Sequence, residues 1–175
     1  MPTPFPPVFD GHNDTILRLY MAKPQTKFDF FADNDGLHID LPKARAGGLG
    51  GGFFALYVPN KEPMGNFPGT TDGGNSYAFP LPKALNRTYA MNFATGMVAR
   101  LLKLEAESDG QTKIVRNADD LASALKSGVL AMILHFEGAE AIDRNLDALH
   151  LFYAAGLRSL GPVWSRPTIF AHGVP

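Results

Sequence analysis

The sequence predicts a parallel α/β fold of the (β/α)8 barrel type, with about the first four strands of the barrel present in the chain. Segments with the apolar content of strands alternate along the chain with segments that have the apolar period of helices. Such alternation is typical of parallel sheets joined by right-handed crossovers. A complete (β/α)8 barrel takes about 250 residues, so a chain of 175 residues makes up roughly half of one.

The first two strand–helix units are expected within residues 8–58. Residues 8–10 complete a first strand, and residues 15–22 follow as a short helix with its apolar side chains on one side. Residues 41–46 form a second short helix, because a proline near its start costs no hydrogen bond and two glycines follow its end. Residues 52–58 are almost wholly apolar, which is typical of a strand in a parallel sheet covered by helices.

A long loop and the longest helix come next. Residues 59–80 are rich in Gly, Pro and Asn and are expected to form a loop. Residues 83–107 are expected to form a helix, since apolar residues recur every four positions and make one stripe. The stripe consists of Leu81, Leu85, Tyr89, Phe93, Met97 and Leu101. After a short extended piece at 114–115, Asn117 caps a helix that Gly128 ends.

The last two strands flank one more helix. Residues 129–136 form an apolar strand that a glutamate and a glycine follow directly. An apolar-striped helix comes next and ends at Gly156, residues 157–163 form the fourth strand, and residues 164–175 form a loop. Because no internal repeat or low-complexity segment interrupts the chain, residues 1–175 are expected to form a single domain.

The composition narrows the classes of function. The formal net charge of −1 gives no electrostatic reason to bind nucleic acid or an anionic membrane. The chain has no cysteine, which excludes disulfides and thiolate metal sites and leaves His, Asp and Glu as candidate ligands. No apolar run approaches the roughly 20 residues that span a bilayer, and the first residues lack the pattern of a signal peptide. We therefore expect a soluble, cytoplasmic protein.

The residues most typical of chemistry stand at the ends of two strands. Residues 10–14 read Asp-Gly-His-Asn-Asp, so His12 and Asp14 point the same way at the end of the first strand. Glu137 follows the third strand, and the carboxyl ends of barrel strands carry the active site. Imidazole and carboxylate bind zinc-like ions, and two metals about 3.5–4 Å apart hold a shared hydroxide as nucleophile. The pattern favours hydrolysis of an amide or ester.

Simpler explanations exist for several of these positions. His12 and Asp14 can also form a hydrogen-bonded loop pair, and Glu137 can be a carboxylate favoured by a helix dipole. His135 shares a strand face with Glu137 and is interpreted as a hydrogen-bonded core histidine. The glycine run at 47–52 lacks the Lys-Ser/Thr of a nucleotide loop and precedes a strand, so close packing of the backbone explains it better.

Four stretches, in matching order and spacing, resemble the renal (membrane) dipeptidase family of zinc hydrolases, within the wider amidohydrolase-like barrels. They are residues 9–14 (FDGHND), 40–48 (DLPKARAGG) leading into the second strand, 136–138 (FEG), and 156–158 (GLR) leading into the fourth strand. The resemblance covers nearly all of the chain and implies the (β/α)8 TIM barrel of metal-dependent hydrolases.

By this resemblance, His12 and Asp14 bind the first of two zinc ions, and Glu137 is the catalytic carboxylate that bridges both. The family hydrolyses dipeptides, which implies a dipeptide substrate whose peptide bond a metal-bridging hydroxide attacks. In the family, the second zinc takes two histidines from the fifth and sixth strands, and a further aspartate comes from the last strand. Those segments are not in this chain, so the second site is incomplete here. The resemblance is also consistent with a homodimer.

Two positions depart from the family pattern. Trp164 stands where many relatives have a substrate-contacting His, so we expect Trp164 to give the substrate site an apolar wall. Gly52 stands where relatives often have Gln. Both changes bear on substrate preference and leave the metal site unchanged.

Two other functions stay open from the sequence. One is another binuclear amidohydrolase that acts on cyclic amides or esters. The other is a silent half-barrel that is active only with a complementary segment, because an unclosed barrel exposes two sheet edges and an apolar interior.

Overall fold

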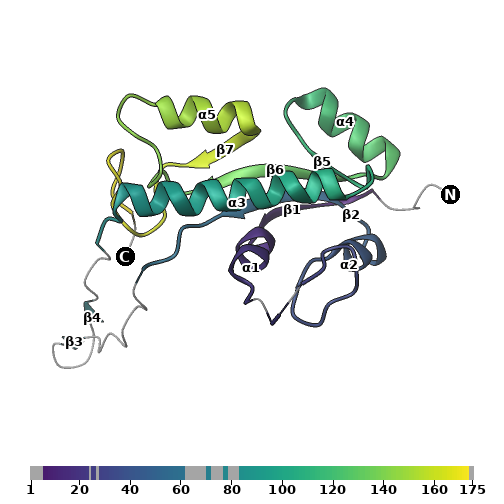
Figure 1. The fold of residues 1–175 in the computed structure, drawn as a ribbon, viewed down its shortest axis with the longest axis horizontal. Coiled ribbons are helices and arrows are strands. Elements are labelled where there is room, and N and C mark those ends of the chain that lie inside the picture. The colour runs from purple at the N-terminus through teal and green to yellow at the C-terminus, as the bar shows by residue number, and fades with distance from the viewer. Residues whose placement is uncertain are drawn as a thin grey trace.

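A five-stranded parallel sheet forms the centre of the fold (Figure 1). The computed structural model describes residues 6–23, 25–26, 28–61, 70–71, 77–78 and 83–173. The strands of the sheet are β1 (Val8–Asn13), β2 (Leu49–Leu56), β5 (Thr112–Ile114), β6 (Leu130–Glu137) and β7 (Leu157–Gly161). A separate antiparallel pair consists of β3 (Thr70–Thr71) and β4 (Tyr77–Ala78). The helices are α1 (Thr15–Met21), α2 (Leu41–Ala46), α3 (Arg87–Glu107), α4 (Ala118–Ser127) and α5 (Asp147–Ala155).

Strand β6 is the central strand of the sheet. Its residues 131–136 pair with β2, its residues 130–132 pair with β5, and its residues 134–137 pair with β7. Since a strand has only two edges, β5 and β7 share the edge opposite β2. The main strands therefore follow one another in the order β1-β2-β6-β7, as successive strands do in a (β/α)8 barrel.

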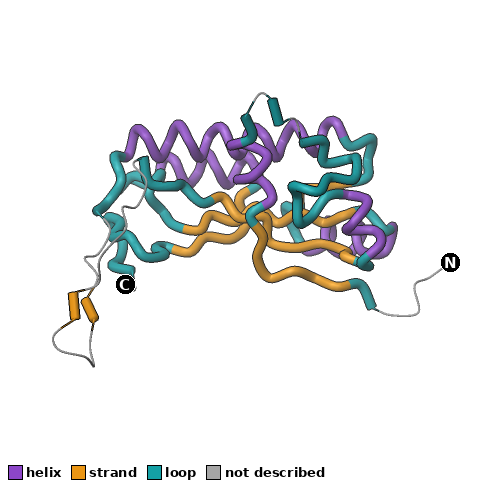
Figure 2. Tube along the Cα trace, turned by 90° about the horizontal axis from the view of Figure 1, so that it is seen from below, coloured by secondary structure: helices purple, strands orange, loops and turns teal. Residues whose placement is uncertain are grey.

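The helices cover one face of this sheet. Alternate side chains of β6 are at most 4% exposed and belong to the main core; they are Leu130, Met132, Leu134 and Phe136. The opposite face of β6 carries Ile133, His135 and Glu137, which are only partly buried. Figure 2 shows the strands on one side of the molecule, with the helices on the other side and at its flanks. The less covered face is the one that the interior of a closed barrel would contain.

Local capping fixes the ends of two helices near their predicted positions. The Asp40 side chain accepts a hydrogen bond from the backbone N of Lys43 at 2.8 Å and caps α2, which also has proline in its first turn. The Asn117 side chain accepts from the backbone N of Asp120 at 2.8 Å and caps α4. That helix ends at Gly128, whose φ of 72° suits glycine. The predictions for both helices are confirmed.

The longest helix begins later than predicted. It starts at Arg87 instead of residue 83, because Asn86 has an extended conformation and its side chain accepts from the backbone N of Tyr89 at 3.1 Å. The stripe position Leu81 and most of the predicted loop lie outside the described residues. Within the described part of the chain, no helix combines the length and apolar character that crossing a bilayer requires.

Each strand of the sheet differs somewhat from its predicted bounds. Strand β1 continues to Asn13, three residues past its predicted end at residue 10. Strand β5 occupies residues 112–114 instead of 114–115, and β6 occupies residues 130–137 instead of 129–136, so Glu137 is its last residue. Strand β2 begins at Leu49, three residues early, because its glycines pair with the backbone of both β1 and β6. It ends at Leu56 instead of residue 58. Strand β7 ends at Gly161 instead of residue 163, since Pro162 has no N–H to continue the ladder.

Gly51 lies where β2 passes closest to its neighbours. A Cβ atom there would be 2.5 Å from the carbonyl oxygen of Ala131 and 2.7 Å from the ring of Phe9. We expect Gly51→Ala to lower the free energy of unfolding by about 2 kcal/mol, because the crowding atoms include backbone that cannot move aside freely. Urea unfolding measures this, with Gly11→Ala as the control, since no atom lies within 4 Å of that Cβ position. Equal destabilisation by both changes would contradict the close-packing interpretation.

Candidate metal centre

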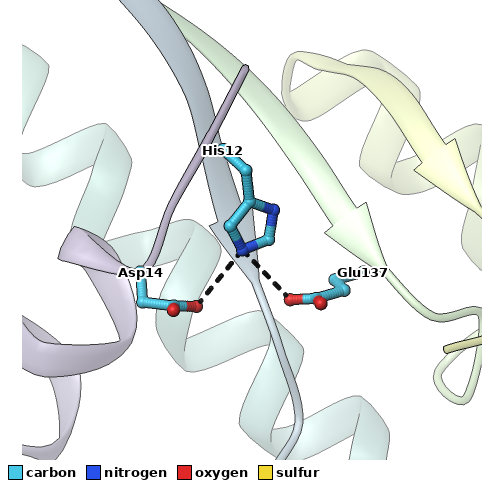
Figure 3. Close-up of side chains that lie close together, drawn as sticks. All are labelled: His12, Asp14 and Glu137. Carbon is cyan, nitrogen blue, oxygen red and sulfur yellow. Dashed lines mark ion pairs between the residues drawn. The ribbon is translucent and has the colours of Figure 1, made fainter. Parts of the chain in front are cut away.

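Three candidate ligands converge at the carboxyl ends of β1 and β6 (Figure 3). His12 is near the end of β1, Asp14 directly precedes α1, and Glu137 is the last residue of β6. The Nε2 atom of His12 is 3.7 Å from Oδ1 of Asp14 and 3.5 Å from Oε2 of Glu137. One ligand atom from each residue lies within 4.8 Å of the others. The structure therefore brings together the three residues that the sequence singled out as metal ligands.

Burial distinguishes Glu137 from the other two. Its side chain is 21% exposed, whereas those of His12 and Asp14 are 43% and 51% exposed. Burial raises the pKa of Glu137; the imidazole of His12 lowers it in part, and the carboxylate of Asp14 raises it again. A carboxylate whose charge is disfavoured in this way gains from a nearby cation.

The donor set fits a zinc-like divalent cation. One imidazole nitrogen and two carboxylate oxygens are ligand types that zinc accepts. Bonds of about 2.0–2.1 Å at tetrahedral angles place neighbouring donors about 3.3 Å apart. The two distances from His12, 3.5 and 3.7 Å, are close to that spacing. Two carboxylates side by side also leave negative charge that a cation would neutralise.

His135 lies behind the ring of His12. The two ring centroids are 6.2 Å apart at an interplanar angle of 77°, an edge-to-face contact. The Nδ1 atom of His135 is 2.8 Å from Oγ of Ser159, so the predicted hydrogen bond is confirmed. Its placement in the core is wrong, because His135 is only partly buried on the less covered face of β6. Burial lowers the pKa of His135, and neighbouring His12 lowers it further, so the neutral form is favoured. His135 supports the candidate ligand without joining the ligand cluster.

Trp164 lies in the loop after β7, at the same carboxyl edge of the sheet as the three ligands. Its side chain is 48% exposed. Its ring meets that of Tyr57 edge to face, with centroids 5.4 Å apart and an interplanar angle of 86°. The indole therefore presents part of its apolar surface to solvent at this edge of the sheet.

The sequence profile of the membrane dipeptidase family, peptidase family M19, matches residues 5–175. The chain belongs to this family. Its predicted family resemblance is therefore confirmed over nearly the whole sequence.

Two solved metallopeptidase structures agree with this assignment. The chain is 44% identical to dipeptidase AC, an M19 metallopeptidase, with a TM-score of 0.80 over 95% of this chain and 45% of that one. It is also 44% identical to a metallopeptidase from Rhodobacter sphaeroides liganded with a phosphinate mimic of the dipeptide L-Ala-D-Ala; the TM-score is 0.82 over 97% of this chain and 48% of that one. An uncharacterized protein in the PQQ-III 3′ region of Acinetobacter calcoaceticus is 32% identical over 179 residues, 96% of this chain and 52% of that protein.

The chain spans about half the length of these relatives. M19 dipeptidases have the TIM-barrel fold, so the parallel sheet of this family member is about half of such a barrel. The predicted fold class is confirmed.

Sequence reasoning missed a buried arginine beside the site. Arg166 is 2% exposed, and its Nη2 atom forms an ion pair with Oε1 of Glu140 at 2.8 Å. A weak signal was present, because Arg166 is the only Lys, Arg, Asp or Glu among residues 160–175. A lone charge in an apolar stretch indicates either exposure or a buried partner, and the sequence does not say which.

Proposed function

We propose that this chain is part of a zinc-dependent dipeptidase. The observation that carries the proposal is the convergence of His12, Asp14 and Glu137 at the carboxyl edge of the sheet in a member of the M19 family. In this proposal His12 and Asp14 bind one zinc ion, and Glu137 is the ligand shared with a second. Residues 1–175 then form a single domain, the first half of the barrel.

The residues of the chain prepare the site for that chemistry. When bound, zinc supplies a Lewis acid that polarises the peptide carbonyl and acidifies water. The ring of His12 contacts the ring of His135 edge to face. The Nε2 atom of His12 lies between the carboxylates of Asp14 and Glu137, as Figure 3 shows. Glu137 presents a partly buried carboxylate whose charge a cation would stabilise.

A shared role for Glu137 is supported by its two oxygens. Among the described residues, the cluster offers one imidazole and two carboxylates, which is too few for two complete zinc sites. Since one carboxylate oxygen of Glu137 faces His12, the other is available to a second ion. The other ligands of a second ion would have to come from residues outside the cluster of His12, Asp14 and Glu137.

A dipeptide is the proposed substrate class. The related Rhodobacter sphaeroides metallopeptidase is liganded with a phosphinate mimic of L-Ala-D-Ala. A phosphinate is tetrahedral, as is the species formed when water adds to a peptide carbonyl, and enzymes bind such mimics tightly. We propose that Trp164, supported by Tyr57, forms an apolar wall against a side chain of the dipeptide.

Zinc content and hydrolysis after metal removal test this proposal. The protein would be dialysed exhaustively against metal-free buffer, analysed for zinc, and assayed with dipeptides, lactams and lactones before and after zinc is restored. We expect dipeptide hydrolysis to disappear on zinc removal and to return with at least one bound ion per chain.

Two results would contradict the proposal, and a third would show that the chain alone is not the active unit. Hydrolysis that survives complete zinc removal would exclude the metal role. Hydrolysis of lactams or lactones alone would favour an amidohydrolase for cyclic substrates. Tight zinc binding without any hydrolysis would favour a half-barrel that needs a complementary segment.

A further inference from the structure

Arg166 is the largest of the fully buried side chains among the described residues. Its Nη1 atom donates to the hydroxyl of Tyr57 at 2.9 Å and to Oδ1 of Asn60 at 3.1 Å. Its Nη2 atom donates to the carbonyl oxygen of Val58 at 2.5 Å and to Oε1 of Glu140 at 2.8 Å. Each guanidinium nitrogen has a partner, since Nε also donates to Glu140 at 3.3 Å. Such complete pairing is what allows a charge to remain buried.

These contacts join three loops at the carboxyl edge of the sheet. Residues 57–60 follow β2, Glu140 follows β6, and Arg166 follows β7. The loop after β6 begins directly behind the candidate ligand Glu137. There Gly138 has a φ of 124°, and a Cβ atom on it would clash with the carboxylate of Glu140. The arginine therefore ties together loops that border the metal ligands.

Tyr57 lies between the arginine and the tryptophan. The guanidinium carbon of Arg166 is 4.8 Å from the centroid of the Tyr57 ring, and the same ring meets Trp164 edge to face at 5.4 Å. One end of this stack is buried, because Arg166 is 2% exposed, and the other is open, because Trp164 is 48% exposed. The Tyr57 ring therefore contacts both the buried guanidinium and the open indole.

We propose that Arg166 is a positioning residue for the substrate site: it holds Tyr57 in place, and Tyr57 holds Trp164 as a wall of fixed orientation. The assignment of a dipeptide as the ligand of this wall rests on the proposed function. Arginine is required because one planar group must donate to four acceptors and stack on a ring at once. A lysine has the charge but neither the plane nor the number of fixed donors.

Fluorescence of Trp164 tests the positioning directly, because the chain contains a single tryptophan. We expect acrylamide quenching to increase by up to about twofold in Arg166→Met and in Arg166→Lys, since a released indole moves from half to full exposure. Arg158→Met is the matched control. Arg158 also stacks on a tyrosine, Tyr153 at 3.9 Å, but lies at the start of β7, away from Trp164.

A second variant covers the case in which Arg166 variants do not fold. Tyr57→Leu removes the ring between Arg166 and Trp164 while leaving the arginine its contacts to Glu140 and Val58. We expect it to release the indole in the same way. Unchanged quenching in folded Arg166→Met, or in Tyr57→Leu, would overturn the proposal, and so would an equal increase in Arg158→Met.

Kinetics separate positioning from a purely structural role. In Arg166→Lys, we expect KM for dipeptides with large apolar side chains to rise about tenfold, as for the loss of an apolar contact, with kcat and zinc content unchanged. A loss of zinc with a fall in kcat would show that the arginine supports the metal centre instead of the wall. If the parent protein hydrolyses no dipeptide, the proposed function fails, and the fluorescence result still decides the role of Arg166.

Discussion

Glu137→Gln is expected to lower kcat/KM for dipeptides by more than about 100-fold, because even residues that only support metal ligands cost about 10- to 100-fold when replaced. Glutamine keeps the shape of the side chain but removes its charge and one ligand oxygen. Zinc bound per chain should fall together with hydrolysis. Near-normal hydrolysis by this variant would contradict the assignment of Glu137 as a metal ligand.

In contrast to its loss of hydrolysis, metal-free Glu137→Gln should be at least as stable as the metal-free parent protein. Burial raises the pKa of Glu137, so its ionised form is disfavoured in the folded chain. A raised folded pKa contributes stability that is complete below the unfolded pKa, 4.5, and is lost as the pH rises through the folded value. At pH 7 the neutral amide removes this penalty. Metal-free Glu137→Gln should therefore unfold at the same temperature as the metal-free parent or at a higher one.

Glu105→Gln is the matched control for this experiment. The Glu105 side chain is also 21% exposed, but it lies in α3 and accepts a hydrogen bond from the backbone N of Ile114 at 2.7 Å. We expect this variant to lose stability while the folded fraction keeps its zinc. Equal loss of zinc in both variants would show that metal binding responds to general destabilisation.

The parts of the fold that depend on neighbouring residues could be predicted from the sequence. Pro42, Asn117 and Gly128 act through backbone preferences and hydrogen bonds within a few residues, so the ends of α2 and α4 agree with the prediction. The candidate site was predictable for a similar reason. His12 lies next to the end of β1, Glu137 ends β6, and the carboxyl ends of parallel strands meet at one edge of the sheet.

Contacts between distant segments had no local pattern to reveal them. The sharing of one edge of β6 by β5 and β7 depends on their lengths and on the path of the chain between them. Arg166 meets Glu140 and Tyr57, which are 26 and 109 residues away in the chain. A buried charge of this kind is recognised only when all of its partners are in place.

Asp40→Ala is expected to lower the free energy of unfolding by about 3 kcal/mol, of which a lost helix cap accounts for about 1 kcal/mol. The Asp40 carboxylate is completely buried. Its Oδ1 atom accepts from the backbone N of Lys43 at 2.8 Å, and its Oδ2 atom accepts from the backbone N of Asn34 at 3.0 Å and from Nζ of Lys43 at 2.8 Å. Alanine leaves the two backbone N–H groups without an acceptor at the start of α2, whereas Nζ of Lys43 still donates to the carbonyl oxygen of Leu37. Urea unfolding at neutral pH measures the effect.

Acid should remove the same stabilisation from the parent protein. Burial raises the pKa of Asp40, but the hydrogen bonds from Lys43 and Asn34 outweigh burial and hold the pKa below 3.8. A lowered folded pKa contributes stability that is complete above the unfolded pKa and is lost as the pH falls through the folded value. The difference in free energy of unfolding between the parent protein and Asp40→Ala should therefore narrow only below about pH 3.8.

Asp33→Ala is the control for the Asp40 variant. Asp33 also pairs with Lys43, at 3.3 Å, but its side chain is 78% exposed, so this variant should change stability little. Equal loss of stability in both variants would show that the ion pair with Lys43, and not the buried hydrogen bonds of Asp40, is the source of the stabilisation.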